Sequence, residues 1–558
     1  MSQYPQSDLC LASTHAVENM PPLLQDYNLF DQDIALKQAV KRGQAGWSVQ
    51  QLQAFGQQCG SLQQIEMGSQ ANRQKPVLIT HDRYGNRVDL VDFHPTYHQL
   101  MANSINQGLH CSPWREPKLG AHLARAAGNY LQTQVEAGHG CPITMTFACF
   151  PTLQKQPEIA KAWLPLISSN QYDNRNIPWF QKKGVTIGMA MTEKQGGSDV
   201  RTNSTVAHPV AEKGPGQGYE LVGHKYFVSA PMSDAFLMLA QTDGGISCFL
   251  VPRWRPDGSK NPLQLIQLKD KMGNTSNASS ETELRGAFGW MIGEEGRGIA
   301  NILEMVSMTR FDCMVASAGA MRQAVSQATH HCHYRSAFGK TLDKQPLMQN
   351  VLADLVLESE ASVAMALHVA AKLDQAQHDD EAKDFVRIAN AIGKFWVCKR
   401  TPAHAYEAME CIGGSGVMEN CIMPRLYREA PINTIWEGSG NVQCLDVLRA
   451  MQKSPRSLEA FMAELAQARG LHKGYDQYFD KLHQTFKDQN TLEYRARSVV
   501  EQLAISFQAA TLLRSENSAV ADAFCQARLS DRSGLVYGTL PREIDCAALI
   551  ERARPNIS

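Results

Sequence analysis

The sequence predicts a mostly α-helical chain that is interrupted in its middle by a β domain. Apolar residues recur at helical spacing from about 31 to 183, and the same spacing returns after Gly293. Between about 185 and 288 the chain carries short β-rich runs, such as GYELVGHKYFVS, that Gly, Pro, Asn and Asp interrupt. A chain of 558 residues is also too long for a single core, so several domains are expected.

The order of these patterns divides the chain into four expected segments. They are an N-terminal arm and α domain at 1–184, a β domain at 185–288, an α-helical domain at 289–456 and a C-terminal helical domain at 457–558. The β domain should consist of antiparallel strands. In the third segment the periodicity predicts two long helices over 298–339, one over 344–373 and one over 387–414.

Composition argues against several classes of function. The net charge is −1, so no global field draws the chain to nucleic acid or to a membrane. No apolar run reaches the ~20 residues of a membrane helix, and the N-terminus shows no secretory pattern. The fourteen cysteines form no CxxC pair and predict reduced thiols in the cytoplasm. We interpret HHCH at 330–333 as a polar helix face, because a metal site would need further ligands.

Two loops of small residues, about 240 positions apart, carry the strongest functional signal. They are MTEKQGGSDV at 191–200 and IWEGSGN at 435–441. Glycines in such loops allow backbone N–H groups to approach a ligand closely. The second loop holds one carboxylate, Glu437, between Trp436 and Gly438. A dry pocket would tune the proton affinity of that carboxylate, as a general base requires.

In this order the motifs resemble the acyl-CoA dehydrogenase family, whose cofactor is FAD. The α, β, α domain order of that family agrees with the periodicity described above. The resemblance implies that the backbone of Met191 and the hydroxyl of Thr192 hold the flavin ring, and that Ser198 reaches a cofactor phosphate. In GHKYFVSA it places Phe227 against the ring and Ser229 at flavin N5.

The resemblance implies a second set of cofactor contacts that serve a neighbouring subunit. Arg335 and Phe338 in RSAFGK would reach the FAD of that subunit, since a guanidinium matches pyrophosphate oxygens. Gln345, Gly413 and Gly414 continue the pattern, and shared FAD would make the protein an obligate oligomer. The remaining expected cofactor contacts are Met189, Ala190, Gly197, Ile435, Trp436, Gly438, Ser439, Gly440 and Asn441.

Glu437 matches the residue that removes the proton α to a thioester carbonyl in this family, while a hydride leaves the β carbon for flavin N5. Some family members place the base earlier, on a long helix. That position is Thr309 here, next to Arg310, which favours Glu437. Asp312 is the only carboxylate nearby and is a weaker alternative.

The chain departs from the usual family pattern in three places. Lys194 and Gln195 replace the Pro and small residue that usually follow Thr-Glu, Trp436 is bulkier than usual, and the segment 457–558 is extra. These features most closely resemble a branch of the family that acts in the bacterial adaptive response to DNA alkylation. That resemblance implies a homotetramer, a dimer of dimers, that binds double-stranded DNA through the C-terminal segment. It also implies weak dehydrogenation of acyl-CoA thioesters of the isovaleryl-CoA kind.

Four arginines of the C-terminal segment are the candidate DNA contacts: Arg495, Arg497, Arg528 and Arg532. Binding through phosphates would be sensitive to salt and tolerant of sequence. Acidic and basic residues nearly balance in this segment, so the alternative is that these arginines form an ordinary solvated face. Arg449, after the second loop, could serve an anionic ligand or cap the domain junction.

Two main functions compete at this point. One is an ordinary metabolic acyl-CoA dehydrogenase that performs α,β-dehydrogenation of acyl-CoA, with the extra segment in oligomer contacts. The other is a stress-response protein that binds DNA and uses the enzyme fold as a scaffold. A flavin oxidase or a dealkylating repair enzyme is a third possibility, but no base-flipping pocket or metal motif supports it. We expect the second function, with residual dehydrogenase activity.

Overall fold

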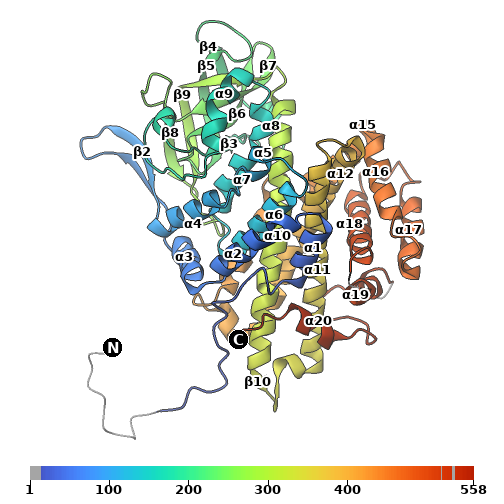
Figure 1. The fold of residues 1–558 in the computed structure, drawn as a ribbon. Helices are drawn as coiled ribbons and strands as arrows, with labels where there is room; N and C mark the ends of the chain where they lie inside the picture. The colour runs from blue at the N-terminus through green and yellow to red at the C-terminus, as the bar shows by residue number, and fades with distance from the viewer. Residues whose placement is uncertain (1–13, 517, 531–533, 558) are drawn as a thin grey trace.

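The computed structural model describes residues 14–516, 518–530 and 534–557. The fold is mostly α-helical with a β domain between helical parts, which confirms the predicted fold class (Figure 1). Three long helices run through the centre of the molecule: α10 (Gly298–Tyr334), α11 (Pro346–Gln375) and α12 (Asp380–Ile412). The β domain sits at one end of this bundle, and the last helices pack along its side.

The N-terminal part is helical and carries one hairpin. Its helices are α1 (Ile34–Arg42), α2 (Val49–Cys59), α3 (Leu62–Arg73), α4 (Pro95–Asn106), α5 (Ser112–Arg115), α6 (Ala121–Val135), α7 (Gly140–Ala148), α8 (Phe150–Leu153) and α9 (Pro157–Ile167). The hairpin, β1 (Val77–His81) and β2 (Arg87–Asp92), interrupts a stretch that was expected to be helical. Asp82 starts its turn by accepting hydrogen bonds from the amides of Tyr84 and Asn86.

The β domain is a sheet of seven strands. They are β3 (Ile187–Ala190), β4 (Val206–Pro209), β5 (Gly218–Ser229), β6 (Ala235–Thr242), β7 (Gly245–Pro252), β8 (Leu263–Leu268) and β9 (Ser279–Ile292). The order is β3-β6-β4-β5-β9-β7, with β8 on β9, and a β6–β7 pairing closes the path into a barrel. Most pairs are antiparallel, but β3 and β4 each run parallel to β6.

The segment 298–339 forms one helix of 37 residues, so the prediction of two helices there was wrong. Gly319, near its middle, marks a close contact and not a break. A Cβ at Gly319 would lie 2.8 Å from the carbonyl oxygen of Tyr130, so the glycine lets α6 approach α10. A short hairpin follows the helix, made of β10 (Ser336–Ala337) and β11 (Lys340–Thr341).

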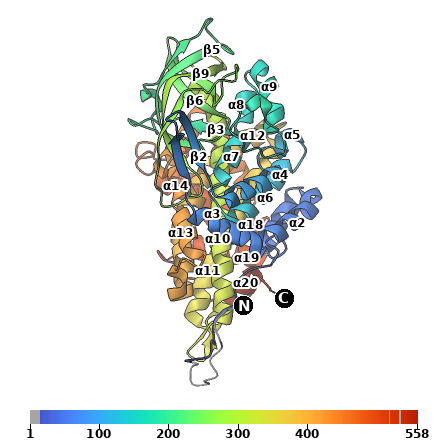
Figure 2. The ribbon, with the colours of Figure 1, turned by 90° about the vertical axis from the view of Figure 1, so that its left-hand side faces the viewer.

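The C-terminal helices share their core with the long helices. Figure 2 shows the molecule from the side, with the β domain above α10 and α11. The C-terminal helices are α13 (Met423–Glu429), α14 (Ile432–Ile435), α15 (Gly440–Lys453), α16 (Pro455–Ala466), α17 (Lys473–Thr485), α18 (Ala496–Leu513), α19 (Ser518–Arg528) and α20 (Cys546–Ala553). Phe385 of α12 packs against Phe461 and Phe507, with ring centroids 5.7 and 5.5 Å away. Among the described residues, no helix is long and apolar enough to span a membrane.

Candidate active site

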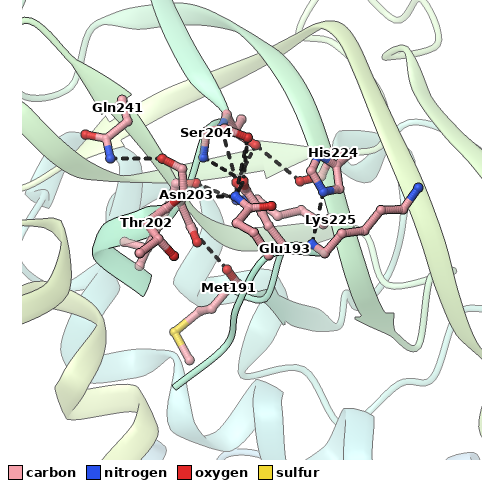
Figure 3. Close-up of polar contacts among 12 residues, drawn as sticks. Met191, Glu193, Thr202, Asn203, Ser204, His224, Lys225 and Gln241 are labelled. Carbon is pink, nitrogen blue, oxygen red and sulfur yellow. Dashed lines mark hydrogen bonds and ion pairs between the residues drawn. The ribbon is translucent and has the colours of Figure 1, made fainter. Parts of the chain in front are cut away.

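A buried carboxylate, Glu193, orders the loop that follows β3 (Figure 3). Its Oε1 accepts hydrogen bonds from Lys225 Nζ at 2.7 Å and Thr205 Oγ1 at 2.6 Å. Its Oε2 accepts from the amide of Ser204 and from Gln195 Nε2, both at 2.7 Å. Burial alone would raise the pKa of Glu193, but Lys225 and the other donors lower it to about 2. The carboxylate is therefore ionised and ties both ends of the loop to the barrel.

The expected flavin contacts Met191 and Thr192 lie on this ordered loop. Asn203 Nδ2 donates to the carbonyl oxygen of Met191 at 2.9 Å. The backbone amide of Tyr226, on β5, donates to the carbonyl oxygen of Thr192 at 2.8 Å and so joins the loop to the sheet directly. Both carbonyl groups are thus held by the protein. The amides of Glu193, Lys194 and Gly196 also have partners within the protein, so the Thr192 hydroxyl is the group of this loop that we expect to meet a ligand.

The other expected contacts on this side fall into two groups. Met189 and Ala190 are buried within β3, so only their backbone can face a ligand. Gly197 and Ser198 are exposed at the turn of the loop, where Ser198 is free to meet a phosphate. A Cβ at Gly197 would lie 2.9 Å from Thr192 Oγ1, so a larger residue would press on that hydroxyl.

The second loop presents Glu437 from a constrained backbone. Its φ is 58°, in the left-handed region that a residue with a side chain rarely adopts. Arg310 Nε donates to the Glu437 carbonyl oxygen at 2.8 Å, and buried Lys394 donates to the carbonyl oxygens on either side at 2.9 and 2.6 Å. Thr309 Oγ1 donates to the carboxylate at 2.7 Å. Burial raises the pKa of Glu437 against the opposing effect of these donors, which suits a general base.

The alternative base positions have other roles. Thr309 is a hydrogen-bond donor to Glu437 and orients its carboxylate. Asp312 is buried in an ion pair with Arg125 and also accepts from Thr144 Oγ1 at 2.6 Å. Its charge is already neutralised inside the helical core, so the structure favours Glu437 as the base.

Four polar groups, Lys271, Ser279, Ser229 and Cys141, form a cluster near Glu437, and sequence analysis missed all of them except Ser229. Lys271 Nζ donates to Ser279 Oγ at 2.8 Å, and Ser279 Oγ lies 3.1 Å from the hydroxyl of the expected flavin contact Ser229. Burial lowers the pKa of Lys271 to about 8. Burial raises the pKa of Cys141 to about 12, with Lys271 and Ser229 opposing the shift and Glu437 adding to it. No motif spacing links Lys271 and Cys141, so only the fold brings them together.

Phe227 offers an aromatic face on β5, two residues before Ser229 of this cluster. Its side chain is 43% exposed, unusual for a phenylalanine on a strand of a closed sheet. Tyr226 meets it edge-on, and Lys269 Nζ lies 5.2 Å from its ring centroid. An exposed aromatic ring next to Ser229 suits the stacking role that the family resemblance implies for Phe227.

The residues that depart from the family pattern are explained by local contacts. Gln195 turns inward and serves Glu193, so it belongs to the anchor of the first loop. Lys194 is exposed and pairs with Glu281 on β9. Trp436 is half-buried, and its Nε1 donates to Asn433 Oδ1 at 2.8 Å.

The rest of the second loop combines exposed positions with a required glycine. Gly438 has a φ of 97°, and a Cβ there would lie 2.6 Å from Gln443 Nε2. Ser439 precedes the first residue of α15, Gly440, which is buried. Ile435 and Asn441 are exposed. These two side chains are therefore the ones on this loop that are most open to a ligand or to another subunit.

The expected contacts to a neighbouring subunit lie on the β10–β11 hairpin. Phe338 is 99% exposed at its tip, with a φ of 52°. Arg335 Nη1 donates to the carbonyl oxygen of Asn19 at 2.6 Å, and the Asn19 side chain pairs with the backbone of Ser336. The N-terminal arm thus uses one hydrogen-bond donor of the Arg335 guanidinium, which was expected to bind pyrophosphate.

Gln345, Gly413 and Gly414 lie at the same end of the molecule as that hairpin. Gln345 Nε2 donates to the carbonyl oxygen of Ala337 at 2.9 Å, and a Cβ at either glycine would meet no atom within 4 Å. Thr309 lies on α10, and Arg335 directly follows the last residue of that helix. The separation of 26 residues between these positions corresponds to a distance of about 40 Å along the helix axis. The base and the hairpin of one chain therefore belong to different sites.

The candidate DNA contacts occupy different environments. Arg495 is half-buried and donates to the Asp488 carbonyl oxygen at 2.9 Å. Arg497 and Lys399 are both exposed. The Nη2 atom of Arg497 and the Cε atom of Lys399 lie close to Gly440. Among the described residues, neither Arg497 nor Lys399 forms an ion pair.

Arg528 is less open to a phosphate. Arg528 is largely buried at the contact between α19 and α11, where it pairs with Asp354 and Glu358. This placement argues against a DNA contact, because the guanidinium is already neutralised by two buried carboxylates. Arg532 lies outside the described residues. Arg449 is exposed on α15, and its Nη1 is 3.9 Å from Asp446.

Comparison with known proteins agrees with this architecture. Three family models match the chain: the Adaptive response protein AidB N-terminal domain at 19–174, the acyl-CoA dehydrogenase middle domain at 188–287 and the acyl-CoA dehydrogenase C-terminal domain at 296–452. The putative acyl-CoA dehydrogenase AidB of Escherichia coli K12 is 44% identical over 94% of this chain and 96% of its own length. The chain belongs to the acyl-CoA dehydrogenase family.

Two further comparisons agree with this architecture. Acyl-CoA dehydrogenase family member 11 of Caenorhabditis elegans is 31% identical over 74% of this chain and 69% of its own length. The solved structure of Bd2924 in its apo form has a TM-score of 0.81 at 26% identity, and covers 92% of this chain and 100% of that one.

FAD is the cofactor of this family, and the residues of the site fit it. Phe227 presents an open aromatic face, and Ser229 and Lys271 place hydrogen-bonding groups beside it. The open glycines Gly413 and Gly414 leave backbone accessible at the opposite end of the molecule. Within the described ranges, no group of three or more His, Cys, Asp or Glu side chains could hold a metal ion.

Proposed function

We propose that this chain is an FAD-containing protein of the bacterial adaptive response to DNA alkylation. In this proposal it binds double-stranded DNA without strong sequence preference, protects it or helps to repair it, and retains weak acyl-CoA dehydrogenase activity. The observation that carries the proposal is the 44% identity to AidB over 94% of the chain. The acyl-CoA dehydrogenase models end at residue 452, so that likeness must include most of the additional C-terminal segment.

The two exposed cations beside the base loop support the DNA part of the proposal. Arg497 and Lys399 come from α18 and α12 and converge on Gly440 without an ion pair to another described residue. A phosphate bound between them would place the nucleic acid backbone at the edge of the base loop. Arg495 is a secondary candidate because its guanidinium lies within ion-pair distance of Asp488. Arg532 stays a candidate because of its position in the sequence alone.

We test this part by titrating labelled duplex with the full-length protein at two salt concentrations. The double variant Arg497→Gln, Lys399→Gln should lose about tenfold or more in affinity, and its log–log salt slope should fall by about 1.8 for two lost phosphate contacts. The matched control Lys473→Gln, Lys487→Gln removes the same charge from exposed positions on and after α17. Equal losses in both double variants would contradict a site beside the base loop.

The same geometry supports the residual dehydrogenase activity. FAD supplies a hydride acceptor when it is bound. Glu437 would take the proton α to the thioester carbonyl, while Thr309 and Lys394 hold the carboxylate and its backbone in place. The homotetramer proposed with this function would let the β10–β11 hairpin of one subunit serve the cofactor of another.

The second candidate function, an ordinary metabolic acyl-CoA dehydrogenase, is favoured by the well-oriented Glu437, whose pKa is raised by burial. It predicts that an acyl-CoA bleaches the flavin rapidly. Glu437→Gln should lower the rate of bleaching by about 10²–10⁴-fold while FAD stays bound, because the base is lost and the shape is kept. Stopped-flow absorbance across acyl chain lengths measures this. Slow bleaching of the wild-type protein at every chain length would reject the metabolic alternative.

A further inference from the structure

A cavity of about 270 Å³ lies where the N-terminal α domain meets the C-terminal helices. Its ionisable lining residues come from α1, α11 and α16 and from the residue that follows α18: Arg42, His368, Lys372, Glu464 and Arg514. Burial lowers the pKa of His368, so it is not counted as a cation. None of the residues of the candidate active site lines it. At ~30 Å³ for each water molecule, the cavity has room for a small ligand.

Positive charge exceeds negative charge in this cavity. Glu464 is its one carboxylate and accepts from Lys372 Nζ at 2.9 Å and from Arg514. Burial would raise the pKa of Glu464, but hydrogen bonds from these cations and from His368 lower it, so it is ionised. The three cations Arg42, Lys372 and Arg514 therefore face one carboxylate, which leaves two positive charges in excess.

Arg42 is the cation that this network leaves unneutralised. Within the described part of the chain, its guanidinium forms no ion pair and no hydrogen bond. The nearby carboxylate of Glu516 pairs instead with Lys41, at 2.9 Å. Arg42 is an exposed residue at the cavity. Partial burial of its guanidinium and the charge of Arg514 lower the pKa of Arg42, Glu516 opposes this shift, and an arginine stays protonated at neutral pH. An anion in the cavity would relieve the repulsion between Arg42 and Arg514.

We propose that this cavity binds a small phosphate dianion, either inorganic phosphate or a phosphate monoester, between Arg42, Lys372 and Arg514. The two excess charges match such a dianion, and the planar donors of a guanidinium match phosphate oxygens. Since Arg42 belongs to α1 and Arg514 lies at the end of α18, the ligand would join the N-terminal domain to the C-terminal segment.

Isothermal calorimetry on the full-length protein tests this proposal at constant ionic strength. Inorganic phosphate and glycerol 3-phosphate are the probes, and we expect one saturable site per chain for at least one of them. Arg42→Gln should weaken binding about tenfold or more, because it removes a charge-assisted contact. Lys473→Gln is the matched control: it removes the same charge from an exposed position on α17, and Lys473 does not line the cavity. It should leave the affinity unchanged.

The outcomes separate the possible sources of the phosphate. Tighter binding of glycerol 3-phosphate than of inorganic phosphate would identify a monoester site, and equal binding an inorganic phosphate site. Arg42→Gln should melt at or above the wild-type temperature without phosphate, which shows that the variant folds. No saturable heat with either probe, or equal losses in the two variants, would overturn the proposal. Displacement of phosphate by a short DNA duplex would overturn it too, because the cavity would then serve the DNA backbone.

Discussion

At the scale of single residues, the site depends on groups whose proton affinity is shifted by burial. Burial raises the pKa of Glu437, so its carboxylate binds a proton more readily than an exposed glutamate does. Burial lowers the pKa of Lys271 to about 8, so its charge is lost more readily than that of an exposed lysine. Both shifts suit chemistry near neutral pH.

The Lys271 shift predicts a pH-dependent flavin spectrum. Lys271 should be positively charged below about pH 8 and neutral above it. The absorbance of the bound flavin should therefore change with a midpoint near 8, and Lys271→Met should abolish that change. Lys194→Met, at an exposed position on the first loop, should retain it. A midpoint near 8 that persists in Lys271→Met would assign the change to another group.

Lys271 should also affect stability at alkaline pH. Its folded-state pKa of about 8 lies below the ordinary value of 10.5. Between these values the unfolded chain binds more protons than the folded chain, so this lysine makes the free energy of unfolding rise with pH. The rise should be smaller in Lys271→Met, and denaturant unfolding at pH 8 and pH 10 measures the difference.

At the scale of elements, the Glu193–Lys225 pair holds the first loop against the barrel. Glu193→Gln should lower the free energy of unfolding by about 3–5 kcal/mol, because Lys225 would stay buried without its partner. FAD content should fall as the loop loosens. Lys194→Gln removes the exposed partner of Glu281 and leaves that buried carboxylate paired with Lys269, so it should cost about 1 kcal/mol or less. Denaturant unfolding and the flavin-to-protein absorbance ratio measure both effects.

The pH dependence of this pair has a definite sign. The pKa of Glu193 is about 2, below the ordinary value of 4.5. The stabilisation is fully present above pH 4.5 and is lost as the pH falls toward 2. In Glu193→Gln this part of the acid sensitivity should be absent. An unchanged acid unfolding curve would show that other carboxylates control stability in that range.

At the scale of the whole molecule, the C-terminal segment is part of the main core. The rings of Phe385, Phe461 and Phe507 meet across α12, α16 and α18, and Arg528 pairs with two carboxylates of α11. Removal of the segment would expose the apolar faces of α11 and α12 and leave Asp354 and Glu358 without Arg528.

We therefore predict that a chain truncated after residue 456 does not fold cooperatively. Large exposed apolar faces promote aggregation, so its soluble yield should fall steeply. The full-length double variant Arg497→Gln, Lys399→Gln should instead melt close to the wild-type temperature, since both residues are exposed. Soluble yield and thermal melting measure this. A soluble truncated protein with a cooperative transition would show that the segment is an independent domain, as the sequence pattern had suggested.

Local patterns in the sequence were enough to predict the fold class and the two loops of the site. Helical and strand periodicities depend on neighbours along the chain, so they indicated the helical parts and the central β domain. The two small-residue loops stand out in the sequence, but the role expected for Glu437 came from the resemblance to the acyl-CoA dehydrogenase family. The β1–β2 hairpin was missed within a stretch of helical spacing, and two helices were predicted where α10 forms a single helix of 37 residues.

Contacts between distant segments were decided by the tertiary structure alone. Asp312 and Glu437 are both carboxylates in the sequence, but only the fold shows that Arg125 neutralises Asp312 and that Thr309 orients Glu437. In the same way, Arg497 is exposed whereas Arg528 is buried between two carboxylates. Burial and ion pairing set the charge and the reach of a side chain, and both depend on residues that lie far away in the sequence.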